Sequence, residues 1–173
     1  MPWILLFDPT SACNKHCVGC WAAEYGHQFN LSYDEMDSLV TQAEALGTRL
    51  FMMTGGEPLV RKKDVLRLAK EHSESLFNIF TNASLIDDAF CEDVADAANI
   101  VFSISLEGTE DTNDARRGEG SYDEALAAMR RLRERYVYVV TSHGTVGDQY
   151  ATVEDTCAVA PCFALPGTAT GGT

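Results

Sequence analysis

The chain has 173 residues, 46% of them hydrophobic and 23% charged, and its 13 Lys and Arg against 26 Asp and Glu give a net charge of −13. This length suits one domain, since domains usually run about 100 to 200 residues, and the composition excludes collagen-like and disordered chains. A strongly acidic chain without a basic stripe repels a phosphate backbone, so we expect no nucleic-acid partner.

We expect the apolar amino-terminal run to be a strand and not a targeting or membrane signal. The apolar run at 3–7 is followed at once by Asp8 and Pro9, and it lacks the basic start and cleavage site of a signal peptide. No run approaches the roughly 18 consecutive apolar residues of a membrane span. Six cysteines, three of them within eight residues, are typical of metal ligands rather than of a disulfide framework. We therefore expect a cytoplasmic protein with no membrane partner.

Short β-rich runs alternate with helical patterns along the chain. The runs predict five strands, at 3–8, 49–53, 76–80, 100–105 and 136–141. The helical patterns predict four helices between them, at about 32–46, 64–73, 87–98 and 121–135. This alternation is typical of βα units built around a parallel sheet.

The sequence Ser-Tyr-Asp-Glu opens two of these helices, at 32–35 and at 121–124. Ser followed three residues later by Glu predicts a capping box, in which the hydroxyl and the carboxylate satisfy free backbone N–H groups at the start of a helix. We therefore expect Ser32 and Ser121 to be N-caps, and Gly47 to end the first helix.

Five strands and four helices predict an α/β fold of the partial (βα) barrel type, because a βα chain needs further units before its sheet closes. We expect this core to cover residues 1–141. The composition then changes, since all 13 basic residues lie at or before Arg135 and Thr, Gly and Ala dominate the remainder. Residues 142–173 are therefore expected to form a poorly structured, truncated or non-native tail.

Three cysteines, Cys13, Cys17 and Cys20, follow the first predicted strand with the spacing CxxxCxxC. Loops at this position of α/β proteins bind ligands, and thiolate sulfur suits zinc or an iron–sulfur cluster. Three protein ligands on a four-iron cube leave one iron open for a non-protein ligand. A structural zinc knuckle with His16 or His27 as the fourth ligand is an alternative, although such sites usually pair two separated hooks.

A ferredoxin-like electron carrier is a further alternative, and it would need a fourth cysteine. Cys91 lies on the apolar stripe of the third predicted helix, so we expect it to be a buried hydrophobic residue. Cys157 and Cys162 fall in the predicted tail, where they are expected to be incidental thiols.

The cysteine loop resembles the hallmark motif of the radical S-adenosylmethionine (radical SAM) superfamily. Gly55-Gly56-Glu57-Pro58, after the second predicted strand, resembles the GGEP motif of that family, whose backbone and Glu region hold the methionyl amino group of the cosubstrate. A ligand that approaches main-chain carbonyls closely leaves no room for a Cβ, and Pro58 suits the first turn of a helix.

Two more strand ends resemble the family. Thr81-Asn82 resembles its TNG-type strand end, with Ala83 in place of the usual glycine. The run from Ser103 to Gly108 resembles the segment that hydrogen-bonds the ribose of the cosubstrate, and strand alternation puts Ser103, Ser105 and Glu107 on one face.

Asn113-Asp114-Ala115-Arg116-Arg117-Gly118 resembles the (H/N)DxxRG segment of maturase-like members. The resemblance assigns Arg117 to the carboxylate of the cosubstrate, which a guanidinium can grip with two parallel hydrogen bonds. Arg116 and the run 61–63 are expected to be surface charges.

The resemblance spans residues 3–135 and implies a radical SAM enzyme core with no catalytic side chain beyond its cluster. It implies a 4Fe-4S cluster on the three cysteines, and S-adenosylmethionine held by Gly55, Gly56, Glu57, Pro58, Asn82, Ser103, Ser105, Glu107 and Arg117. A reductant such as flavodoxin or ferredoxin would supply one electron, and the resulting 5′-deoxyadenosyl radical would abstract hydrogen from an unknown small-molecule, cofactor-precursor or peptide substrate. Two alternatives remain open, an inactive cluster-binding fragment and a non-catalytic zinc or iron–sulfur module.

Overall fold

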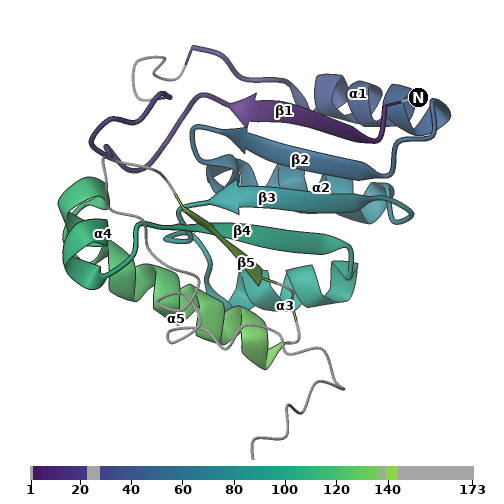
Figure 1. Ribbon diagram of the computed structural model, residues 1–173. Helices are drawn as coiled ribbons and strands as arrows, with labels where there is room; N and C mark the ends of the chain where they lie inside the picture. The colour runs from purple at the N-terminus through teal and green to yellow at the C-terminus, as the bar shows by residue number, and fades with distance from the viewer. Residues whose placement is uncertain (1, 23–27, 136, 138, 144–173) are drawn as a thin grey trace, which may run out of the picture.

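The computed structural model describes residues 2–22, 28–135, 137 and 139–143. One parallel sheet holds five strands in chain order (Figure 1): β1 (Ile4–Thr10), β2 (Leu50–Gly55), β3 (Leu76–Thr81), β4 (Ile100–Leu106) and β5 (Val139–His143). Within the described residues β1 and β5 do not pair, so the predicted partial barrel is confirmed as an open sheet. Residues 142–143, predicted to begin the tail, belong to β5, and residues 144–173 lie outside the described residues.

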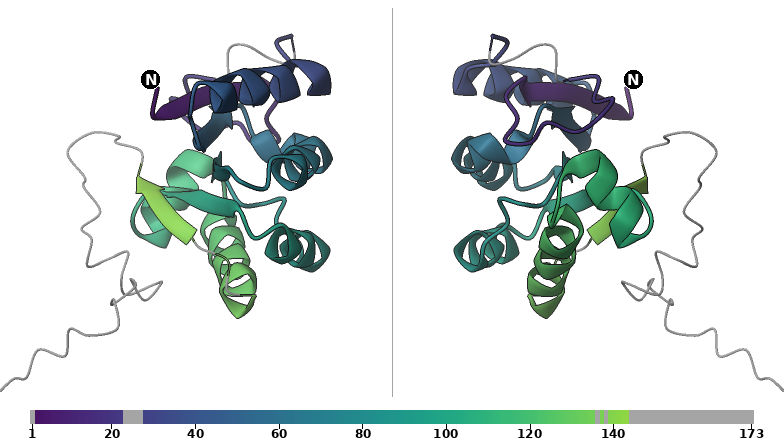
Figure 2. Two further views of the ribbon diagram at one scale, coloured as in Figure 1. Left: turned by 90° about the vertical axis from the view of Figure 1, so that its right-hand side faces the viewer. Right: turned by 90° about the vertical axis from the view of Figure 1, so that its left-hand side faces the viewer.

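The helices follow the strands, and the long ones lie along one side of the sheet, whereas the helix at 110–117 lies beyond the ends of the strands (Figure 1 and Figure 2). Their bounds are α1 (Tyr33–Ala45), η1 (Pro58–Arg61), α2 (Lys62–Glu71), α3 (Asp88–Ala97), α4 (Glu110–Arg117) and α5 (Ser121–Glu134). The four predicted helices are confirmed, whereas α4 and the 3-10 turn η1 were not predicted. Only Asn113 of α4 is buried, so this helix has no apolar stripe that a sequence pattern could detect. In the part of the chain that the structure describes, no helix is long and apolar enough to cross a membrane.

The two faces of the sheet differ because side chains alternate along each strand. Phe51, Phe77 and Phe102 are fully buried on the face that the helices cover, and the rings of Phe51 and Phe77 stack with centroids 5.3 Å apart. On the opposite face, Ile4 and Leu76 are 48% and 42% exposed at the paired ends of their strands. The open face therefore corresponds to the interior of an incomplete barrel.

The predicted capping box at the start of α1 is confirmed. The Ser32 hydroxyl accepts a hydrogen bond from the Glu35 amide at 3.2 Å, and the Glu35 carboxylate accepts one from the Ser32 amide at 2.7 Å. This reciprocal pair fixes the start of α1.

The second capping box is wrong, because a neighbouring helix supplies the cap. Gly120 is the N-cap of α5, and Ser121 is its first helical residue. The Asp114 carboxylate of α4 accepts hydrogen bonds from the amides of Tyr122 (2.9 Å) and Gly120 (2.6 Å). These bonds, the one from Tyr122 above all, hold the pKa of Asp114 below its ordinary value.

We expect Asp114→Ala to lower the free energy of unfolding at pH 7, since it removes the cap of α5. Asp111→Ala, which changes an exposed carboxylate of the same helix, should have a smaller effect. Because the pKa of Asp114 is lowered, its contribution is present above the ordinary value of 3.8 and is lost as the pH falls below it. Urea unfolding at several pH values checks both points, and equal losses in the two variants would contradict the assignment.

Candidate functional site

The three predicted ligand cysteines lie together on the loop that follows β1, residues 11–22, here called the cysteine loop. Cys13, Cys17 and Cys20 are free thiols and half-buried. The Lys15 amide donates a hydrogen bond to the Cys13 sulfur at 3.4 Å, as backbone amides do to the sulfur ligands of iron–sulfur clusters. Burial raises the pKa of Cys13, and the Lys15 amide opposes this shift. This donor set of three soft sulfur atoms fits an iron–sulfur cluster.

The alternative ligands are not gathered around the cysteine loop. Among the described residues, no three His, Cys, Asp or Glu side chains are arranged to hold a single metal ion. His16 is exposed, and Cys91 is fully buried in the core, as predicted. His27, Cys157 and Cys162 lie outside the described residues. The zinc-knuckle alternative therefore gains no support from the described part of the chain.

The end of β2 is bonded directly to the cysteine loop. The amides of Gly56 and Glu57 donate to the carbonyls of Thr10 and Ala12, at 3.0 Å and 2.7 Å. A methyl group on Gly56 would lie 2.1 Å from the Ala12 oxygen, and one on Gly55 would lie 2.6 Å from the Thr10 oxygen. Both glycines are therefore required by the approach of the cysteine loop itself, before any ligand is considered.

The Glu57 side chain joins the ends of β2 and β3. One carboxylate oxygen accepts from the Leu59 amide (2.9 Å) and the Thr81 hydroxyl (2.8 Å), and the other accepts from the Asn82 amide (2.8 Å). Burial raises the pKa of Glu57, while these hydrogen bonds act in the opposite direction. All of these hydrogen bonds to the carboxylate come from the protein itself. Pro58 is the first residue of η1, which agrees with the expectation that it suits the first turn of a helix.

The end of β3 reaches a cysteine. The side-chain nitrogen (Nδ2) of Asn82 lies 4.0 Å from the Cys13 sulfur and donates to the Asn14 side-chain oxygen at 3.0 Å. Ala83, in the place of the family's glycine, has a φ of 67°, and its amide donates to the Thr81 hydroxyl at 3.0 Å. The left-handed backbone gives a physical reason for glycine at this position.

Helix α4 holds the loop from the other side. The Val18 amide, between Cys17 and Cys20, donates to the Arg116 carbonyl at 2.8 Å, and the Arg116 guanidinium donates to the Val18 carbonyl at 3.3 Å. The same guanidinium forms an ion pair with Glu107 at 2.8 Å. Because its side chain is only 19% exposed, the prediction that Arg116 is a surface charge is wrong.

Arg117 also pairs with Glu107, donating from Nε to one carboxylate oxygen at 2.8 Å. Two guanidinium groups thus converge on one carboxylate just beyond β4. Farther back, Ser103 is buried and donates to the Asn78 side chain at 2.9 Å, and Ser105 is half-buried. The structure therefore brings the motif residues that follow β2, β3 and β4 to one edge of the sheet, whereas Ser103 is buried within β4.

Arg61 was also predicted to be a surface charge, and this is wrong. Its guanidinium donates to the Pro9 carbonyl at 2.9 Å and also bonds the Leu31 carbonyl. An ion pair with Asp64 at 2.8 Å holds it in place. Arg61 therefore ties the end of β1 to the segment that leads into α1.

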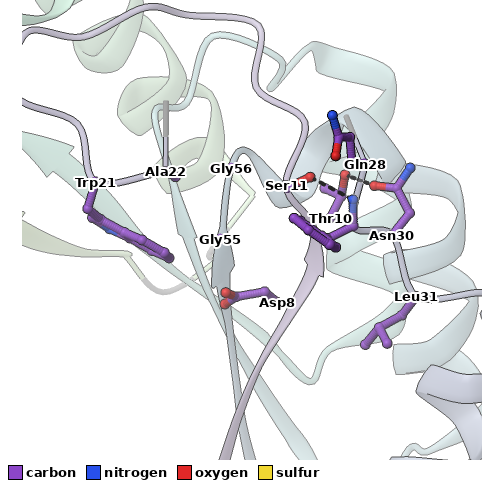
Figure 3. A pocket seen from close by; sticks show the side chains of 11 residues that line it. Asp8, Thr10, Ser11, Trp21, Ala22, Gln28, Asn30, Leu31, Gly55 and Gly56 are labelled. Atoms are coloured by element: carbon purple, nitrogen blue, oxygen red, sulfur yellow. Dashed lines mark hydrogen bonds between the residues drawn. The ribbon is translucent and has the colours of Figure 1, made fainter. Parts of the chain in front are cut away.

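A pocket of about 560 Å³ opens between the ends of β1 and β2 and the cysteine loop (Figure 3). Residues of these segments and of the segment 28–31 that leads into α1 line it: Asp8, Thr10, Ser11, Trp21, Ala22, Gln28, Phe29, Asn30, Leu31, Gly55 and Gly56. Asp8 was not predicted as a site residue, since a single polar residue in an apolar strand is a weak sequence signal. Gly19 stands where the family often has an aromatic residue near the adenine of the cosubstrate, and the resemblance left Trp21 as a candidate to cover that surface.

We expect Glu57→Gln to lower the free energy of unfolding of the metal-free protein by about 1 to 3 kcal/mol. The carboxylate accepts three hydrogen bonds, and the NH2 group of glutamine would face at least one of these donors without being able to accept from it. Glu74→Gln, at an exposed carboxylate, should stay within about 0.5 kcal/mol of the parent. Urea denaturation measures both. If Glu57 served only a ligand, the metal-free variant would be as stable as the parent.

Comparisons with known proteins identify the family of the chain. The family model described as "Radical SAM superfamily" matches residues 7–160. Fe-coproporphyrin III synthase of Methanosarcina barkeri is 30% identical over 141 residues, which are 79% of this chain and 35% of that protein. The sporulation killing factor maturation protein SkfB of Bacillus subtilis is 28% identical over 165 residues, 89% of this chain and 39% of that protein.

A similar fold occurs in SuiB of Streptococcus suis. Its crystal structure bound to S-adenosylmethionine aligns with a TM-score of 0.78 at 21% identity, covering 91% of this chain and 37% of SuiB. Its structure bound to the precursor peptide SuiA aligns with a TM-score of 0.77. The chain spans little more than a third of the length of these proteins. By its cysteine loop, its open parallel sheet and the match over most of its length, the chain belongs to the radical SAM superfamily.

Proposed function

We propose that the chain binds a 4Fe-4S cluster through Cys13, Cys17 and Cys20 and uses it to cleave S-adenosylmethionine reductively. The observation that carries this proposal is the cysteine loop, where three half-buried thiols are held against the ends of β2 and β3 and against α4. When bound, such a cluster passes one electron from a reductant such as flavodoxin or ferredoxin to the sulfonium, giving methionine and a 5′-deoxyadenosyl radical that takes a hydrogen atom from the substrate.

The residues of the chain bind and orient the cosubstrate. The carbonyls of Gly55 and Gly56 are candidates to accept from the methionyl ammonium, because both residues lie beside the cysteine loop and have no side chain in the way. Glu57 and Pro58 fix this turn from behind. Arg117 is the candidate partner of the methionyl carboxylate.

Polar side chains of β4 and of the residue after β3 are candidates to hydrogen-bond the ribose of the cosubstrate. Asn82 lies beside Cys13, and Ser103 and Ser105 lie on the open face of β4. Glu107 orients Arg116 and Arg117, so its contribution to cosubstrate binding would be made through these two side chains.

We further propose a peptide substrate. SkfB is named as a maturation protein of a killing factor, and SuiB was crystallised with its precursor peptide. Fe-coproporphyrin III synthase is named for a porphyrin, which carries several propionate groups. A chain of net charge −13, with the carboxylate of Asp8 in its pocket, is poorly suited to a polyanion.

Anaerobic reconstitution tests the cluster and the cleavage together. The parent chain, loaded with iron and sulfide, reduced with dithionite and given S-adenosylmethionine, should yield 5′-deoxyadenosine measurable by mass spectrometry. Cys17→Ala should lose bound iron and product to background. Cys91→Ala is the matched control and should retain both, since Cys91 is buried in the core.

Other outcomes favour the alternatives. A Cys17→Ala protein that made product at the parent rate would contradict the ligand assignment. Intact cluster and bound S-adenosylmethionine without product would favour an inactive cluster-binding fragment. A zinc-loaded parent protein that takes up no iron would favour a structural zinc module.

A further inference from the structure

The Asp8 side chain points into the pocket without a partner. Asp8 lies on the open face of β1, and within the described residues its carboxylate has no hydrogen-bond or ion-pair partner. Partial burial raises its pKa, and no opposite charge offsets this. Arg61, which bonds the carbonyl of the next residue, Pro9, has its ion pair with Asp64 instead. Asp8 is exposed to solvent, so its carboxylate is hydrated and is open to a ligand that enters the pocket.

The indole of Trp21 lies across the pocket from this carboxylate (Figure 3). Trp21, directly after Cys20, is 62% exposed, and Figure 3 shows its indole and the Asp8 carboxylate pointing toward one another across the pocket. Gly55 lies beside Asp8, and a methyl group there would come within 2.9 Å of the Asp8 Cβ, so glycine keeps this wall of the pocket open. A carboxylate opposite an indole is a pair of groups that both attract cations.

We propose that Asp8 and Trp21 bind a cationic group of the substrate, such as a lysine or arginine side chain or an amino terminus. Both residues lie close to the cysteine loop in the chain. Trp21 directly follows the third cysteine, and Asp8 lies two residues before Thr10, whose carbonyl accepts a hydrogen bond from the Gly56 amide. A cation held there would anchor the substrate beside the cysteine loop, which deepens the proposed function by naming the substrate chemistry.

S-Adenosylmethionine also carries an ammonium and a sulfonium, so the cosubstrate is a second possible source of the cation. A pocket that served the cosubstrate would bind it through Asp8, and substrate cations would then compete with it. A pocket that serves the substrate would bind a cation with S-adenosylmethionine in place. The two sources are therefore separated by measuring both ligands on the same variants.

The probe is Nα-acetyl-lysine methylamide, with the uncharged Nα-acetyl-norleucine methylamide as its matched control. Ligand-observed saturation-transfer NMR on the reconstituted chain should give binding of the lysine probe well above that of the norleucine probe. Asp8→Asn should weaken the lysine probe about fivefold, the upper range for an accessible ion pair. Trp21→Leu should weaken it about two- to fivefold. Asp96→Asn, at an exposed carboxylate of α3, should leave it unchanged.

Equilibrium dialysis of S-adenosylmethionine completes the test, and its affinity should be the same in Asp8→Asn and in the parent. Equal binding of the two probes, or no effect of Asp8→Asn, would overturn the proposal. Competition between the lysine probe and S-adenosylmethionine, with both weakened by Asp8→Asn, would assign the pocket to the cosubstrate and overturn it as well.

Two controls keep these outcomes separate from other failures. Circular dichroism identifies a variant that does not fold, and Asp8→Glu, which keeps the charge, should retain most of the binding of the lysine probe. A parent chain that binds this probe through Asp8 but makes no 5′-deoxyadenosine would contradict the proposed reaction and leave the cation site standing.

Discussion

Two backbone hydrogen bonds, from Gly56 to Thr10 and from Glu57 to Ala12, join the end of β2 to the cysteine loop. These bonds require the two backbone segments to approach so closely that neither Gly55 nor Gly56 could carry a side chain. Because β1 leads directly into the cysteine loop, the register between β1 and β2 determines where Cys13 lies relative to the end of β2. Asn82 at the end of β3 bonds Asn14, the residue after Cys13, and Arg116 of α4 bonds Val18, which lies between Cys17 and Cys20.

Residues of the family motifs here serve the fold as much as a ligand. Glu57 accepts three hydrogen bonds that join two strand ends, and Asp114 caps the neighbouring helix α5. Arg116 grips the loop between the second and third cysteines. A motif residue can thus be needed for a cofactor site by holding its backbone, which has consequences for how mutants of Glu57 or Arg116 are interpreted.

The sheet and the four longest helices could be predicted because their patterns are local. Alternation along a strand and an apolar stripe along a helix are visible in a short window, and so is the capping box at Ser32. Helix α4 could not be predicted, since polar hydrogen bonds take the place of an apolar stripe. Asn113 and Asp114 bond the segments that flank the helix, and Arg116 bonds the distant Val18. The same reason made Ser121 look like a cap and Arg116 look like a surface charge.

The site divides in the same way. The cysteine spacing and the glycine pair are sequence motifs, whereas the Asp8 carboxylate becomes notable only when the fold turns Trp21 toward it and leaves it unpaired. The reason for the glycines could not be predicted either, because it lies in the carbonyls of Thr10 and Ala12, more than 40 positions away in the chain. Contacts of this range depend on the sheet register, which single residues do not encode.

The central claim is that the protein fold holds the cysteine loop in place before any metal binds. Hydrogen–deuterium exchange of the iron-free chain tests it most directly, at the amides of Val18, Gly56 and Glu57. The account predicts that these amides are protected in the iron-free protein nearly as well as those within β2 and β3. Exchange at the rate of an unstructured loop until iron and sulfide are added would contradict it and would mean that the cluster itself orders the loop.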